Sequence, residues 1–226
     1  MLFGEIVEPS TRALIEDDLE EYPEYTESVP EWEGSSETPR DINGLLFIET
    51  EKIGKLFYSC VLGENKPLSK IKNAGIEVFD IGNKQYVVIF SEKKDFTCGE
   101  VTELFDPWIR KAKRTFTITS DSIGNYQNSN FTEKPVSLIR TVSNDPSKSF
   151  GYEKLESPNL VSGLGASVLS YCIHLDLKCT LFVLYIDTSP LGSVNMEPLL
   201  KLVTKLDIPV KHTEMKISTS SSNLYM

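Results

Sequence analysis

The segment Gly163-Leu164-Gly165 is one place where this sequence could bind a ligand. Two glycines at this spacing match the start of a dinucleotide fingerprint, in which a strand, a tight turn and a helix N-terminus hold a pyrophosphate. The third small residue of that pattern is absent, and the residues before Gly163 do not read as a strand. We therefore expect the two glycines to permit close packing of a helix, either on a sheet of the same chain or on a partner protein.

Ser170 and His174 come nearest to a nucleophile and a base, because a spacing of four residues places both on one helix face. Catalysis would also need an orienting acid and an oxyanion hole, and the sequence offers no nucleophile elbow and no Walker A loop. We predict a structural serine, a histidine near a helix end and no catalytic residue.

Thiols and imidazoles are too scattered to suggest a metal centre. Zinc sites need closely spaced pairs of ligands, and the sequence has none among its cysteines at 60, 98, 172 and 179 and its histidines at 174 and 212. Buried free thiols in a reducing compartment are the simpler interpretation. We predict no metal and no cofactor.

The last three residues, Leu224-Tyr225-Met226, follow a polar stretch at 218–223. A flexible leash with this end can act as a plug, since the apolar side chain is buried, the phenol orients and a carboxylate pairs with a lysine. Because the motif is only three residues long, it does not by itself indicate a binding function.

Charge divides the chain into an acidic arm and a neutral body. The net charge is −10, and residues 1–40 hold twelve acids against Arg12 and Arg40, which accounts for all of it. We expect residues 1–40 to be mostly disordered. Phe3 and Ile6 form an apolar tip that is either a docking peptide or a strand packed on the body. Neither part has the basic excess that nucleic-acid binding needs.

The remaining sequence alternates between strand and helix patterns. Helices are predicted over 97–112 with a break at Asp106-Pro107, from Ser157-Pro158 onward, and after a cap at Asn195. The second of these is expected to bury a stripe of side chains that runs from Val161 to Ile173. Strands are predicted at 45–48, 76–81, 85–90, 115–119, 136–142, 179–186 and 213–217.

This order predicts an α/β fold. We expect one three-layer domain over 41–217, with a mixed, largely parallel sheet flanked by helices, and a flexible tail over 218–226. The longest apolar run has far fewer than the roughly 20 residues of a membrane span, and no secretory signal is evident. The expected location is the cytosol, the nucleus or both.

Several segments resemble the proteasome assembly chaperone 1 family. The likeness is clear at both ends and over 157–187, and through 41–150 the order of elements agrees. The segments that carry it are Phe3–Val7 with Arg12-Ala13, Asn159–Val161, Ala166–Cys172, the strand through Tyr185 to Asp187, and Ser222–Tyr225.

The resemblance implies a binding protein without catalysis. Family members pair with proteasome assembly chaperone 2 as a heterodimer of related α/β domains. The pair sits on the outer face of the ring of proteasome α-subunits, promotes ring assembly and blocks premature activator docking. The family's hydrophobic-Tyr-x tail enters a pocket between α-subunits, and here it maps to Leu224, Tyr225 and Met226. Gly163 and Gly165 are candidates for the heterodimer face, and Phe3 and Ile6 for an anchor toward the ring's pore.

Two other classes stay open on the sequence alone. A small α/β hydrolase or nucleoside-processing enzyme would need a polar constellation at the carboxyl ends of the strands. A general adaptor with an acidic tail would lack a dedicated partner fold.

Overall fold

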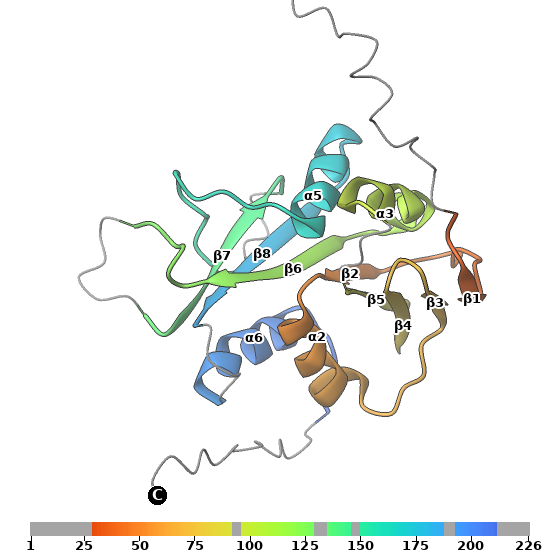
Figure 1. The fold of residues 1–226 in the computed structure, drawn as a ribbon, viewed down its shortest axis with the longest axis horizontal. Helices are drawn as coiled ribbons and strands as arrows, with labels where there is room; N and C mark the ends of the chain where they lie inside the picture. Colours follow the sequence, from red (N-terminus) through yellow and green to blue (C-terminus); the bar gives the residue numbers. More distant parts are fainter. Residues whose placement is uncertain (1–28, 92–95, 129–134, 146–149, 188–192, 212–226) are drawn as a thin grey trace, which may run out of the picture.

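An eight-stranded mixed sheet forms the centre of the molecule (Figure 1), in the order β1-β3-β4-β5-β2-β6-β8-β7. The computed structural model describes residues 29–91, 96–128, 135–145, 150–187 and 193–211. The strands are β1 (Trp32–Gly34), β2 (Gly44–Ile48), β3 (Ser69–Ile71), β4 (Ile76–Gly82), β5 (Gln85–Phe90), β6 (Thr115–Ser122), β7 (Ser137–Ser143) and β8 (Cys179–Ile186).

The middle of the sheet is parallel and buried on both faces. Strand β2 pairs in parallel with β5 and β6, and β6 pairs in parallel with β8. All eight residues of β8 are buried, as expected for a parallel strand that is covered by helices on both sides. The predicted mixed α/β sheet is confirmed, with its parallel pairs at the centre.

Antiparallel strands complete both ends of the sheet. The strands predicted at 76–81 and 85–90 are confirmed as β4 and β5, which form a hairpin. Asn83 and Lys84 in its turn both have positive φ, the geometry of a type I′ turn. Strand β7 pairs with β8, and β1 pairs with β3. Because Trp32–Gly34 forms β1, the domain begins before the predicted boundary at residue 41, and this part of the predicted arm belongs to the sheet.

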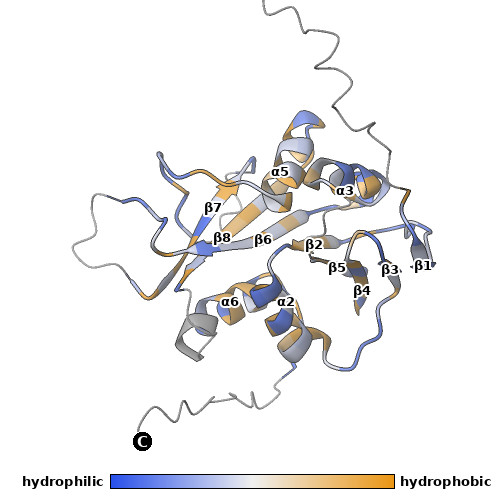
Figure 2. Ribbon diagram, viewed as in Figure 1, coloured by the Kyte–Doolittle hydropathy of each residue, from blue (hydrophilic) through white to orange (hydrophobic). Residues whose placement is uncertain are grey.

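Helices cover both faces of the sheet, so the predicted three-layer arrangement is confirmed. One face carries α3 (Cys98–Leu104), α4 (Asp106–Lys111) and α5 (Leu164–His174). The other carries α2 (Glu51–Phe57), the π-helical turn η1 (Tyr58–Leu62) and α6 (Ser193–Lys205). Figures 1 and 2 show α3 and α5 on one side of the strands and α2 and α6 on the other, with hydrophobic residues along the central strands. Among the described residues, none of the helices combines the length and apolarity of a membrane span.

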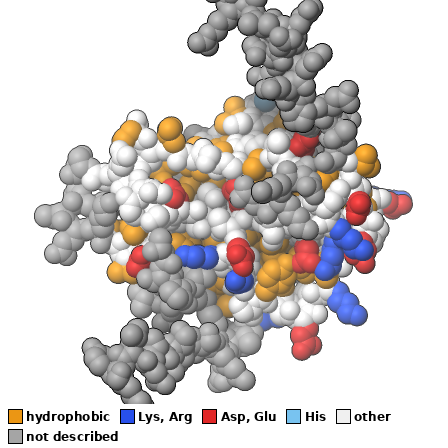
Figure 3. All heavy atoms as spheres, in the orientation of Figure 1, with side chains coloured by type: hydrophobic (Ala, Val, Ile, Leu, Met, Phe, Trp, Pro, Cys, Tyr) orange, Lys and Arg blue, Asp and Glu red, His pale blue; other side chains and the backbone are white. Residues whose placement is uncertain are grey.

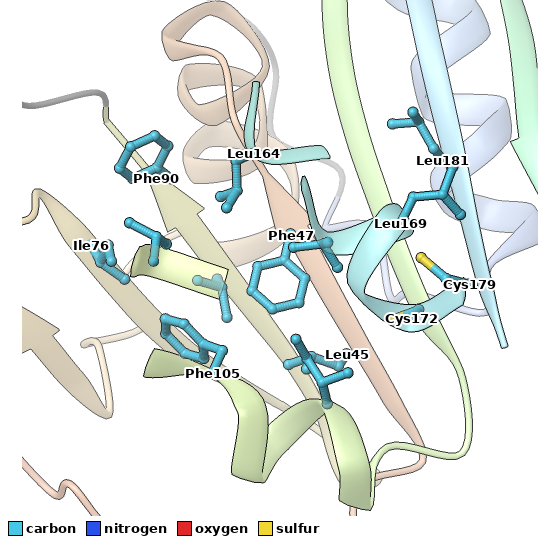
Figure 4. Close-up of a cluster of buried hydrophobic side chains, with 14 of the residues drawn as sticks. Leu45, Phe47, Ile76, Phe90, Phe105, Leu164, Leu169, Cys172, Cys179 and Leu181 are labelled. Carbon is cyan, nitrogen blue, oxygen red and sulfur yellow. The ribbon is translucent and has the colours of Figure 1, made fainter. Parts of the chain in front are cut away.

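Each face has its own hydrophobic core. The first joins β2 to α4 and α5, where Leu45 and Phe47 meet Phe105, Leu164 and Leu169, and Figure 4 shows these side chains between the strand and the helices. The second lies under α2, η1 and α6. The sheet therefore holds both helical layers in fixed positions.

The predicted start of the first long helix is confirmed. The Thr97 hydroxyl accepts from the Glu100 amide at 3.2 Å, and the Glu100 carboxylate accepts from the Thr97 amide at 2.6 Å. This reciprocal pair is a capping box. The predicted break at Asp106-Pro107 is also confirmed, because α3 ends at Leu104 and α4 begins at Asp106.

Three predictions about helices are wrong. Ser157-Pro158 forms a turn closed by the Asn159 amide and the Glu156 carbonyl, and α5 begins only at Leu164. Helix α6 begins at Ser193 rather than after Asn195, which lies inside its first turn. Ile173, expected on the buried stripe, is 55% exposed, because it lies one residue beyond the stripe that ends at Cys172. The strand predicted at 213–217 lies outside the described residues.

Candidate functional site

Glu49, immediately after β2, caps the N-terminus of α5. Its Oε1 accepts from the Leu164 amide at 2.7 Å, and its Oε2 accepts from the Gly165 amide at 3.1 Å. The first amides of a helix have no partner within the helix, and the helix dipole favours a negative charge there. The carboxylate therefore fills the position that a phosphate would take in a glycine-rich nucleotide site.

The two glycines make room for this contact. Gly163 has φ +88°, and a Cβ built there would lie 1.9 Å from Glu49 Oε1. A Cβ on Gly165 would lie 2.9 Å from Cδ1 of Leu181 on β8. Close packing of the helix on the sheet, one of the two predicted alternatives, is confirmed. That Gly163 and Gly165 also pack against a partner chaperone stays a prediction.

Side chains on the inner surface of α5 tie it to α3 and α4. The Ser167 hydroxyl lies 2.9 Å from the Thr102 hydroxyl and donates to the Cys98 carbonyl at 3.2 Å. The Tyr171 hydroxyl donates to Asp106 at 2.7 Å, and the same carboxylate accepts from Arg110 at 2.6 Å. The segment with the clearest family likeness is thus a rigid part of the domain.

Ser170 and His174 are both exposed on α5. Within the part of the chain that the structure describes, neither side chain makes a hydrogen bond that could orient or activate it, so no triad geometry is built around them. Ser167, the neighbouring serine, is held by α3 and is not available as a nucleophile.

The predicted buried free thiols are confirmed for Cys60, Cys172 and Cys179, whereas Cys98 is half-buried. Cys172 and Cys179 adjoin each other in the core (Figure 4). A hydrogen bond from Cys179 lowers the pKa of Cys172, and the same contact, together with burial, raises that of Cys179. Within the described ranges, no three metal-ligating side chains come together.

A hollow of about 310 Å³ lies at the carboxyl ends of β6 and β8, where an α/β enzyme would bind its substrate. Its lining includes Thr50, Ser120, Asp121 and Asp187. The Ser120 hydroxyl donates to Thr50 Oγ1 at 2.9 Å, and Asp121 accepts from Asn125 at 2.8 Å. These contacts hold the polar groups in structural pairs, and no histidine of the described ranges lines the hollow.

A second hollow, of about 360 Å³, lies beside η1 and is lined by Tyr58, Lys70, Glu77 and Ile89 among others. The carboxylate of Glu77 accepts from the Tyr58 hydroxyl and pairs with Lys70 at 2.5 Å. On the face shown in Figure 3, hydrophobic side chains near α2 are bordered by acidic and basic ones. The hollow is open and its charges are already paired.

The tail is anchored where it leaves the domain. The Lys211 amide donates to the Cys60 carbonyl at 2.7 Å, and the Lys211 ammonium donates to the Leu62 carbonyl at 3.1 Å. These bonds attach the last described residue to η1. The predicted binding residues Leu224, Tyr225 and Met226, and the predicted anchors Phe3 and Ile6, lie outside the described residues.

A buried arginine organises the loops at the β7 edge. Arg140 is 8% exposed. It donates to the Tyr126 hydroxyl at 2.9 Å and pairs with Glu153 at 2.8 Å and with Glu156 at 3.4 Å. Burial opposes ionisation of Glu156, but its hydrogen bond from Tyr126 and the charge of Arg140 outweigh burial, so its pKa lies below the usual value.

We predict that Arg140→Ala lowers the free energy of unfolding by about 2–3 kcal/mol, because the buried Tyr126 hydroxyl and the Glu156 carboxylate, which stay bonded to each other, both lose the arginine. Urea unfolding at pH 7 measures the change. Lys201→Ala removes an exposed pair with Glu197 and should cost less than about 1 kcal/mol. Since folding lowers the pKa of Glu156, the deficit of Arg140→Ala should shrink as the pH falls through that pKa. Equal losses in the two variants would contradict the prediction.

Comparison with models of known protein families identifies a match. A family model described as proteasome assembly chaperone 4 matches residues 90–224, more than half of the chain. No curated protein sequence matches.

The fold is similar to several solved structures, all at low identity. Pyrococcus furiosus PbaA, an archaeal homolog of proteasome-assembly chaperone, is 11% identical with a TM-score of 0.54, over 77% of this chain and 82% of that one. Pyrococcus furiosus PbaB, an archaeal proteasome activator, is 8% identical with a TM-score of 0.51, over 82% and 92%. A Corynebacterium glutamicum protein of unknown function is 6% identical with a TM-score of 0.55, over 80% and 82%. These likenesses show the fold.

Proposed function

The chain belongs to the proteasome assembly chaperone family, and from that premise we propose that it is a chaperone for assembly of the 20S proteasome. The family match over residues 90–224 is the observation that carries the proposal. In the proposed role the chain takes the place of chaperone 1 and forms a heterodimer with proteasome assembly chaperone 2. Gly163 and Gly165 are the candidate packing positions for that partner.

The pair binds the outer face of the α-subunit ring through the C-terminal tail. From Lys211, the twelve residues 212–223 can reach up to about 40 Å, so the tail can enter a pocket well away from the domain. Leu224 supplies apolar burial, Tyr225 supplies orientation and Met226 presents a carboxylate to a lysine of the pocket. A chaperone in this position promotes ring formation and excludes an activator that needs the same face.

The acidic arm supplies a second contact, with Phe3 and Ile6 as an anchor toward the central pore. The twenty-eight residues before Val29 can span up to about 90 Å. The proposed activity is binding in the cytosol or nucleus, without catalysis, cofactor or metal. The pairing of Ser120 with Thr50 and of Asp121 with Asn125 supports this choice over a small α/β enzyme.

Acute depletion of the chain from its native cells should lower the yield of complete α-rings several-fold and raise the share of immature core particles that carry activator. Native gels probed for α-subunits and for activator measure both quantities. Re-expression of the full chain should restore them. Normal ring yield together with normal activator occupancy after depletion would contradict the proposed function.

A further inference from the structure

Basic side chains gather at the amino ends of the parallel strands. Lys113 and Arg114 precede β6, and Lys178 precedes β8. Because Thr115 of β6 pairs with Cys179 of β8, the three bases lie together at one edge of the sheet. They line a hollow of about 230 Å³, and among the described residues Asp145 is its one acidic lining residue.

The neighbouring acids leave this edge with a positive surplus. Asp145 pairs with Lys178 at 3.4 Å, and the Lys113 ammonium donates to the uncharged Asn43 side chain at 3.0 Å. Arg114 is exposed and has no carboxylate partner in the part of the chain that the structure describes. The adjacent Lys84 is paired with Asp41 at 2.7 Å and adds nothing to the surplus. A hollow bordered by unneutralised cations attracts an acidic ligand.

The chain itself carries a segment of the opposite charge. Five acids occur within the six residues 16–21, and no base lies between Arg12 and Arg40. The body from residue 41 onward is electrically neutral in total. The basic edge is therefore a local excess on a neutral domain, and the arm over residues 1–40, which contains this acidic segment, accounts for the whole net charge of the protein.

The root of the arm lies within reach of the basic edge. The Val29 carbonyl accepts from Asn73 at 2.7 Å, in the turn that precedes β4, so the arm leaves at the carboxyl end of β5. From there to the amino ends of β6 and β8 is roughly 35 Å, given about 3.3 Å per residue along a strand and about 4.8 Å between strands. Thirteen extended residues, from Val29 back to Glu16, span up to about 43 Å, and the eleven back to Asp18 span about 36 Å. The leading acids of the segment, Glu16 to Asp18, therefore reach the basic edge, whereas Glu21, only eight residues from Val29, spans about 26 Å.

We propose that the acidic segment 16–21 docks in cis on the edge formed by Lys113, Arg114 and Lys178. Attachment at Val29 gives the segment a high effective concentration, so several weak charge contacts suffice. Docking shortens the free part of the arm to the residues before Glu16 and screens the basic edge from other acidic partners. The inference rests on charge and chain length and holds whether or not the chain acts on the proteasome.

Zero-length carbodiimide cross-linking of the full chain at low concentration tests this docking. The reagent joins a carboxylate to an ammonium only when the two are in contact, and mass mapping identifies the pair. Lys113 and Lys178 report on the proposed edge. Lys66 and Lys201 are exposed lysines elsewhere on the domain and serve as controls.

In about 50 mM salt we expect at least tenfold more cross-links from 16–21 to Lys113 and Lys178 than to Lys66 and Lys201. The excess should vanish at about 1 M salt, where the Debye length is about 3 Å. Arg114→Glu keeps both reporter lysines and should reduce the excess several-fold without changing the thermal midpoint. Equal cross-linking of all four lysines, an excess that survives high salt, or cross-links found only between isotopically distinct copies would overturn the proposal.

Discussion

Removal of residues 224–226 is expected to weaken binding of the chaperone pair to proteasome α-rings by about 100-fold or more. Burial of one large apolar side chain contributes about 1.5–3 kcal/mol, and a charge-assisted hydrogen bond contributes about as much. Two such contacts exceed the 2.7 kcal/mol that corresponds to a factor of 100. Binding of the purified pair to immobilised α-rings, followed by interferometry, measures the loss.

Matched variants of the tail distinguish the loss of the contacts made by residues 224–226 from the effect of a change in tail length. Tyr225→Phe keeps the ring and should cost less than Tyr225→Ala. Two glycines added after Met226 move the carboxylate and should weaken binding, although no side chain is lost. Ser221→Ala, in the polar leash, should change nothing. The unfolding midpoint should stay constant throughout, because the described contacts of the domain end at Lys211. Unchanged affinity after deletion of 224–226 would contradict the role of the tail.

Gly163→Ala is expected to lower the free energy of unfolding by about 2–5 kcal/mol. The residue has φ 88° and ψ −165°, a region that is nearly restricted to glycine and costs other residues about 1–3 kcal/mol. The new methyl group would also lie 1.9 Å from Glu49 Oε1 and expel the carboxylate that caps α5. Loss of a cap and of a charge at a helix N-terminus adds about 1–2 kcal/mol.

Two comparisons make this prediction specific. Gly99 is an exposed glycine in α3 whose added Cβ would meet only the Thr97 hydroxyl at 3.8 Å, so Gly99→Ala should be neutral or slightly stabilising. In a Glu49→Ala background the clash is gone, and Gly163→Ala should then cost only its backbone strain. Thermal and urea unfolding of the four proteins of this cycle measure the coupling. Strictly additive losses would show that Glu49 and Gly163 act independently.

Local sequence patterns predicted the strands of the sheet and the capped start of α3 correctly, because the residues that determine each of them lie within a few positions of one another. The apolar run of β8 and the hydroxyl and carboxylate of the Thr97 capping box are examples. The start of α5 could not be found in this way. Its cap is Glu49, 115 positions away in the sequence, and the Ser157-Pro158 pair offered a local start that the structure uses as a turn. The sequence offered one signal for this start. It has an acid, Glu49, directly after a buried strand, and glycines on both sides of Leu164, where the helix begins.

Amino-acid composition also led to a predicted N-terminal domain boundary, at residue 41, that lies after β1. The acids, prolines and serines around Trp32 indicated a disordered arm, yet Trp32 pairs with Ile71 in the sheet, and its ring centroid lies 6.5 Å from that of Phe105. A long-range contact decides the state of this segment, and local polarity does not reveal it. The proposed contact residues of the tail and the arm tip were suggested by family likeness, and they lie outside the described residues.

Affinity purification from native cells, with an epitope inserted at the exposed Ser36 between β1 and β2, tests the central claim most directly. This position leaves both ends of the chain unmodified. Mass identification of the bound proteins should find a second α/β chaperone together with proteasome α-subunits, and few mature particles that carry activator. Recovery of the chain alone, as a soluble monomer, would contradict its role as a proteasome assembly chaperone.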